Sequence, residues 1–295
     1  MLKTSCSIDY NPFITILAVL LSQNSPILFI KRGQNAKIGF SGRSTMSGHS
    51  KWSKIKRQKG VTDAKRGLLF TKLAREIIIA AKQGGSDSEG NFQLRLAVQR
   101  AKDNNMPLDN IERAIKRASG GDEASNLIEM TMEGYGPNKV AILVQALTNN
   151  RNRTVQEIRS SFMRYGGNLG EGGSVAWMFE RMGVLVVEED IDPNDVALLA
   201  IDAGAEDVKT EGGSTEIYTR PHELEAVRKT LEDKVKISSA DLAFVPKTFI
   251  ELDEAKAIQT MNFIDRLEEL EDVQHVFSNM DFSEAVLEKL RGQSK

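Results

Sequence analysis

The chain has 295 residues, 27% of them charged and 40% hydrophobic, which is enough for two or three domains with hydrophobic cores. Its single cysteine, Cys6, excludes an intrachain disulfide and a thiolate metal cluster, and three histidines offer little material for a metal site or a catalytic triad. The formal net charge of −2 hides an asymmetry, because residues 46–82 carry ten basic and two acidic side chains. A basic segment on an otherwise acidic chain favours a polyanionic partner, and we expect nucleic acid.

Residues 1–45 form an extension that we expect to be disordered or a start-site artefact, with Met46 as the first residue of the protein. A targeting segment is the alternative, since residues 31–45 carry four bases and no acid. The apolar stretch 13–30 is interrupted by Ser22–Pro26, whereas a bilayer requires about 20 consecutive apolar residues. We therefore expect no membrane association.

Residues 46–122 are predicted to form a basic arm followed by three helices. In the first helix, Leu69, Leu73, Ile77 and Ala81 recur on one face while basic residues occupy another side. Glycine pairs and a proline at a first turn mark the helix limits. The helices are expected from Thr62 to Gly84, over 91–104, and from Pro107 to Gly120.

After Asp122 the hydrophobic period changes to two, which is typical of strands, and predicted strands alternate with predicted helices. Strands are expected over 127–133, 140–148, 174–180, 183–188, 207–210, 216–219 and 273–279, with an extended segment over 242–251. Helices are expected over 153–165, 193–203, 221–234 and 253–271. Two similar blocks result, which we interpret as two compact α+β modules of split-βαβ type.

Several segments in order along the chain resemble the YebC/PmpR family of probable transcriptional regulators, whose relatives include mitochondrial translational activators of cytochrome oxidase subunit I. The resemblance spans residues 46–282. The segments that carry it are Gly48-His49-Ser50-Lys51-Trp52, Asp63-Ala64-Lys65-Arg66-Gly67, Asn105-Met106-Pro107, Glu133-Gly134-Tyr135-Gly136-Pro137, Thr148-Asn149-Asn150-Arg151-Asn152-Arg153-Thr154, Gly166-Gly167-Asn168-Leu169-Gly170, Gly173-Ser174-Val175-Ala176-Trp177-Met178-Phe179 and Val245-Pro246-Lys247-Thr248.

The resemblance implies an α+β fold in which an N-terminal three-helix domain is followed by two small split-βαβ (ferredoxin-like) domains, the third inserted in the second. The expected domains are 46–122, 123–180 with 246–283, and the insertion 181–245, followed by a C-terminal helix and tail over 284–295. The resemblance also implies a cytoplasmic nucleic-acid-binding regulator that is not an enzyme. We expect no cofactor and no metal.

The basic arm and first helix are the main candidate nucleic-acid site, because each Lys or Arg that meets a phosphate releases a counterion. Trp52 either stacks on a base or pins the arm to the helices, and no pattern typical of base readout is visible. A second candidate lies at the turn Asn149–Thr154, which either binds an anion or is a capping turn closed by Asn152 or Thr154. The candidate residues are His49, Lys51, Trp52, Lys54, Lys56, Arg57, Lys59, Lys65, Arg66, Lys72, Arg75, Arg151 and Arg153.

Two further segments are less informative. The glycine-rich stretch Gly166–Gly173 lacks the Gly-Lys-Ser/Thr ending of a phosphate loop and precedes a strand, so a flexible turn is expected. The acidic clusters Glu188–Asp190 and Glu268–Asp272 either bind a partner protein or a cation, or are solvated helix ends and loops.

The sequence favours a DNA-binding transcriptional regulator that uses its basic arm and first helix. The alternative is a ribosome-associated translation factor that binds ribosomal RNA through the same arm. A third hypothesis is an adaptor whose arm binds an acidic protein. The oligomeric state stays open.

Overall fold

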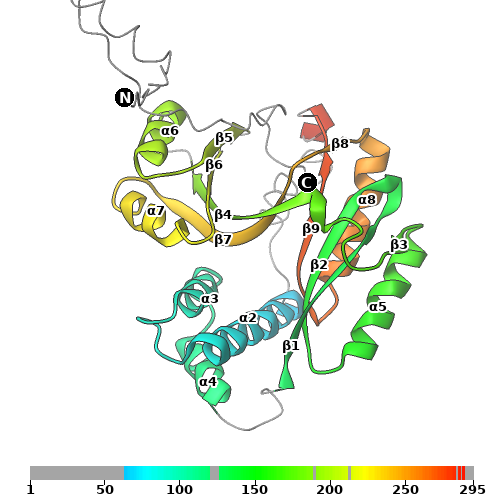
Figure 1. Ribbon diagram of the computed structural model, residues 1–295, viewed down its shortest axis with the longest axis horizontal. Helices are drawn as coiled ribbons and strands as arrows, with labels where there is room; N and C mark the ends of the chain where they lie inside the picture. The colour runs from blue at the N-terminus through cyan, green and yellow to red at the C-terminus, as the bar shows by residue number, and fades with distance from the viewer. Residues whose placement is uncertain are drawn as a thin grey trace, which may run out of the picture. The chain divides into compact units, whose positions relative to one another are not determined.

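The computed structural model describes residues 63–119, 126–188, 191–211, 214–283, 285–286 and 288–289, all within one compact unit, Arg43–Lys295. The predicted extension over 1–45 and the basic arm lie outside these residues. In chain order the described part contains three helices and then two four-stranded sheets with their helices (Figure 1).

The three predicted N-terminal helices are α2 (Asp63–Gly84), α3 (Phe92–Asp103) and α4 (Leu108–Ser119). Leu73, Ile77 and Ala81 of α2 are buried in the core that the three helices share, as their spacing predicts. Asn91 joins α2 to α3. Its side chain caps α3 by accepting from Leu94 N (3.1 Å) and donates to the carbonyl of Ala80 (2.7 Å).

The first sheet has the order β3-β1-β2-β9, with every neighbouring pair antiparallel. Its strands are β1 (Ile128–Tyr135), β2 (Ala141–Thr148), β3 (Asn168–Leu169) and β9 (Val273–Ser278). Helices α5 (Arg151–Arg164) and α8 (Glu254–Glu268) share one core with this sheet. Within it, the rings of Phe162 and Phe263 meet edge to face with their centroids 4.9 Å apart.

The second sheet has the order β5-β6-β4-β7, again antiparallel throughout. Its elements are β4 (Phe179–Glu188), α6 (Pro193–Asp202), β5 (Asp207–Glu211), β6 (Ser214–Thr219), α7 (Leu224–Leu231) and β7 (Ile237–Pro246). This chain order and strand order define two interleaved βαβ units, the split-βαβ arrangement.

All of the second sheet lies between β3 and α8 in the sequence, so one α+β domain is inserted in the other and the expected fold class is confirmed. Strands β4 and β7 pair continuously from Phe179–Pro246 to Val187–Ile237. The domain limits expected at 180/181 and 245/246 therefore fall inside a continuous two-stranded ribbon. Short elements complete the order: η2 (Pro137–Lys139), η3 (Ala176–Met178), β8 (Ile250–Glu251) and β10 (Met280–Asp281).

Three of the predicted elements differ clearly from the structure in type or extent. Residues 174–180 form the 3₁₀ turn η3 and only the start of β4. The backbone bends here because the amides of Gly173, Val175 and Ala176 all donate hydrogen bonds to the Glu133 carboxylate. The extended segment expected over 242–251 begins earlier, at Ile237, since β7 follows β4 along its whole length. The helix expected over 221–234 is shorter, covering only Leu224–Leu231.

Candidate nucleic-acid interface

The predicted site residues fall into two groups. The arm residues His49, Lys51, Trp52, Lys54, Lys56, Arg57 and Lys59 lie outside the described residues. The other six lie on helices: Lys65, Arg66, Lys72 and Arg75 on α2, and Arg151 and Arg153 in the first turn of α5.

Half of the expected basic stripe on α2 is occupied by contacts within the protein. Lys72 Nζ donates to the carbonyl of Glu268 (2.5 Å), and Arg75 donates to the Glu271 carboxylate (2.5 Å) and to Asp272 Oδ1 (2.9 Å). These acceptors lie at the end of α8 and just before β9. The acidic cluster Glu268–Asp272, expected to be solvated or to bind a partner, is therefore a partner of α2. Lys65 and Arg66, near the start of α2, are exposed to solvent.

Asp272 also holds the turn before α5. Its side chain is only 1% exposed, and Oδ2 accepts from Arg153 Nη2 (2.8 Å), Thr148 Oγ1 (3.0 Å) and Thr154 Oγ1 (2.6 Å). Burial alone would raise the pKa of Asp272, but these hydrogen bonds and the charge of Arg153 hold it below its usual value.

The residue that caps α5 is neither of the two predicted ones, Asn152 and Thr154. Asn150 caps the helix by accepting from the amide of Arg153 (3.1 Å), so α5 begins at Arg151 and not at Arg153. Thr154 donates instead to the Asp272 carboxylate, and Asn152 is exposed. Arg153 is tied to Asp272, whereas Arg151 is exposed at the start of the helix.

A second ionic network connects the helices with both sheets. Arg100 of α3 donates through Nη1 to Glu76 of α2 (2.7 Å) and through Nε to Asp241 of β7 (2.8 Å). His275 of β9 lies 3.1 Å from the Glu76 carboxylate. Burial would raise the pKa of Glu76, but the charge of Arg100 and the contact with His275 lower it to about 2. The two acids likewise raise the pKa of Arg100, against its burial.

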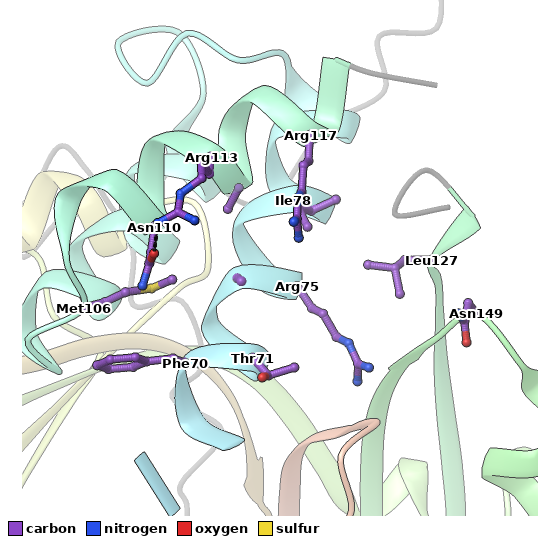
Figure 2. Close-up of a pocket in the computed structure, with 12 residues that line it drawn as sticks. Phe70, Thr71, Arg75, Ile78, Met106, Asn110, Arg113, Arg117, Leu127 and Asn149 are labelled. Atoms are coloured by element: carbon purple, nitrogen blue, oxygen red, sulfur yellow. Dashed lines mark hydrogen bonds between the residues drawn. The ribbon is translucent and has the colours of Figure 1, made fainter. Parts of the chain in front are cut away.

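Between α2, α4 and the ends of β1 and β2 lies an open cleft of about 410 Å³ (Figure 2). Its walls combine three guanidinium groups, two amide side chains and several apolar side chains. The lining residues are Phe70, Thr71, Ala74, Arg75, Ile78, Met106, Asn110, Arg113, Ala114, Arg117, Leu127 and Asn149. We call this the arginine cleft.

The three arginines of the cleft differ in how many of their hydrogen bonds and ion pairs are made within the protein. Arg75 points from α2 toward the strands (Figure 2) and is held by Glu271 and Asp272. Arg113 is exposed on α4, and among the described residues its side chain bonds within its own helix, to the carbonyl of Asp109 (3.0 Å) and to Asn110 Oδ1 (2.6 Å). Arg117 is exposed one turn later, and within the described part of the chain it makes no hydrogen bond or ion pair.

The cleft brings Arg75, a predicted site residue, together with Arg113 and Arg117, which were not predicted. Basic residues near a helix C-terminus, such as these two, are commonly explained by the helix dipole alone. Their spacing of four, which places both on one helical face beside the basic helix, was the available signal. Guanidinium groups suit phosphate because they donate two parallel hydrogen bonds, and the apolar wall with Phe70 and Leu127 can receive the flat face of a base.

Within the described ranges, no group of three His, Cys, Asp or Glu residues is placed to hold a metal ion. None of the described helices is long and apolar enough to cross a membrane.

Comparisons with known proteins agree with this architecture. Residues 50–121 match the TACO1/YebC protein N-terminal domain, and residues 127–280 match the TACO1/YebC second and third domain. The probable transcriptional regulatory protein cbdbA400 of Dehalococcoides mccartyi is 55% identical over 251 residues, covering 84% of this chain and 100% of the relative. A probable transcriptional regulatory protein of Herpetosiphon aurantiacus is 49% identical over the same length, with the same coverage.

A solved structure is also similar. The crystal structure of the conserved hypothetical protein Aq1575 from Aquifex aeolicus superposes with a TM-score of 0.70 at 43% sequence identity, covering 75% of this chain and 93% of that one. The resemblance found in the sequence is confirmed: the chain belongs to the TACO1/YebC family.

Proposed function

We propose that this protein is a nucleic-acid-binding regulator of gene expression that holds a phosphate backbone in the arginine cleft. The observation that carries the proposal is the exposed pair Arg113 and Arg117, placed over a cleft that also offers amides and an apolar wall. Lys116 on α4 and Arg151 on α5 are further exposed cations on the elements that border it. Such a group supplies the counterion-releasing contacts that dominate nucleic-acid affinity.

DNA is the first candidate ligand, and transcription is the process that it implies. The relatives from Dehalococcoides and Herpetosiphon are named probable transcriptional regulatory proteins, which supports this choice. Ribosomal RNA is the second candidate, with translation as the process. The apolar wall of the cleft favours it, because RNA recognition often uses bases that are splayed out of a helix.

The cleft is tested by substitutions that leave the fold intact. Arg117→Ala should weaken binding to a duplex DNA or to a structured RNA and lower the slope of log affinity against log salt by about 1, the value for one lost phosphate contact. Arg266→Ala is the matched control, since Arg266 is also a helical arginine, with 42% of its side chain exposed, but lies on α8. Fluorescence anisotropy at several salt concentrations measures both variants.

Equal salt slopes for Arg117→Ala, Arg266→Ala and the wild-type protein would refute the role of the cleft. Crosslinking in cells, with DNA and RNA recovered together, then separates the two candidate ligands. Enrichment of discrete promoter DNA supports the transcriptional function, whereas enrichment of one ribosomal RNA segment replaces it with a function in translation.

A further inference from the structure

Trp177 is a tryptophan exposed on the surface of the first α+β domain. It lies in η3, and 65% of its surface is exposed. Single exposed apolar residues need no explanation, but this one is held in place beside a second aromatic residue. Trp177 Nε1 donates to the carbonyl of Ser174 (3.2 Å), and the hydroxyl of Tyr135, another exposed residue, lies 3.5 Å from the same oxygen. One carbonyl therefore positions both rings.

The loop that presents these rings is fixed by Glu133. This carboxylate is buried and accepts from the amides of Gly173 (2.8 Å), Val175 (2.9 Å) and Ala176 (2.7 Å). The carbonyl of Glu133 also accepts from Gly170 N (2.8 Å). The carboxylate stays charged, since the three amides hold its pKa below the usual value although burial would raise it. A loop ordered in advance loses little entropy when it binds a ligand.

Four exposed basic residues lie on the segments that meet at or near the loop. They are Lys139 in η2, which follows Tyr135, Arg164 at the end of α5, Arg181 in β4 and Lys247 just after β7. Among the described residues, none of these four makes an ion pair or a side-chain hydrogen bond. Lys247 is next to the loop through its amide, which donates to the carbonyl of Met178 (2.8 Å). Two exposed acids, Glu171 and Glu180, lie in the same region, so the local charge is positive.

We propose that Trp177 and Tyr135 form a stacking platform for an unpaired base of a single-stranded nucleic acid whose phosphates lie among these cations. Aromatic side chains with neighbouring basic residues are the recurrent means of binding single strands. A tryptophan that anchored a protein would be expected in apolar surroundings, whereas this one is bordered by charges. The inference rests on the proposed function and extends it, because the arginine cleft alone does not distinguish paired from unpaired nucleic acid.

The platform is separate from the arginine cleft. Tyr135 ends β1, and Leu127, which lines the cleft, precedes the start of this strand. Eight residues of strand separate them by roughly 25 Å. Substitutions at one site can therefore be made without altering the other.

Intrinsic fluorescence tests the platform directly. The chain has two tryptophans, so Trp52→Phe leaves Trp177 as the only reporter. Titration of this variant with a 12-nucleotide oligouridine RNA should quench the fluorescence in a saturable manner, and a duplex DNA of 12 base pairs should quench it less. Fluorescence anisotropy of a dye-labelled oligouridine needs no tryptophan in the protein, and in this assay Trp177→Ala should weaken binding roughly 5- to 150-fold, equivalent to the ~1–3 kcal/mol of one stacked base. Trp177→Phe should restore much of this loss.

Leu198→Ala is the matched control, because Leu198 is 62% exposed but lies on α6 in the inserted domain. Unchanged oligouridine affinity in the Trp177→Ala variant, together with no quenching of Trp177 in the Trp52→Phe variant, overturns the inference and leaves a protein as the alternative occupant of this surface. If Arg117→Ala weakens binding while Trp177→Ala does not, the platform alone is refuted. If Trp177→Ala weakens binding while Arg117→Ala does not, the cleft is refuted and the platform stands.

Discussion

Replacement of Glu76 by glutamine tests the ionic network that joins the helices to the two sheets. Glu76 is 15% exposed and bonds to Arg100 and His275. Its pKa falls from 4.5 to about 2 in the folded protein. Since one pH unit corresponds to about 1.4 kcal/mol, the ionised carboxylate stabilises the fold by about 3 kcal/mol at neutral pH. Glutamine keeps the shape of the side chain but not the charge, so Glu76→Gln should lose most of this amount.

The stability contributed by the Glu76 carboxylate should decrease as the pH falls. A carboxylate whose folded pKa is lowered contributes its full stability above its unfolded pKa, here 4.5, and loses it as the pH falls toward about 2. The difference between wild type and Glu76→Gln should therefore be about 3 kcal/mol at pH 6 and about 1.4 kcal/mol at pH 3. Urea unfolding followed by circular dichroism at both pH values measures it.

The control for this experiment is Glu269→Gln. Glu269 is 50% exposed and pairs at 3.4 Å with Arg266, so the pair contributes less than about 1 kcal/mol and the variant should stay close to wild type. A loss below about 0.5 kcal/mol for Glu76→Gln at pH 6 would refute the reasoning, since it would place the interaction among surface pairs. The same conclusion follows if the loss does not shrink at pH 3.

Three further substitutions probe other contacts by urea unfolding. Asp272→Ala should cost about 3–5 kcal/mol, because it leaves the Arg75 guanidinium without its buried partner; a cost like that of a surface pair would argue against the network. Gly183→Ala should cost about 1–3 kcal/mol, since the new Cβ would lie 2.4 Å from Thr219 Oγ1, and a neutral effect would show that the strand can shift. Gly67→Ala in α2 has open space and should gain about 0.5–1 kcal/mol; a loss would mean that the helix begins after this residue.

The sequence by itself determined the elements with strong local patterns. The spacing of Leu73, Ile77 and Ala81 predicts the buried face of α2, and the two-residue alternation predicts β1 and β2 to within two residues, because side-chain direction follows backbone period. The turn around η3 could not be predicted from the local pattern. There a distant carboxylate, Glu133, decides the backbone conformation, so a strand was expected in its place.

Only the tertiary structure decided which basic residues are available to a ligand. Lys72 and Arg75 have the spacing of an exposed basic stripe, yet they contact acceptors 196 residues away at the end of α8. Arg113 and Arg117, which were not among the predicted site residues, line an open cleft. Hydrophobic period is a property of neighbours in the chain, whereas the pairing of a charge depends on which acids the fold brings within about 4 Å, a distance that no local spacing encodes.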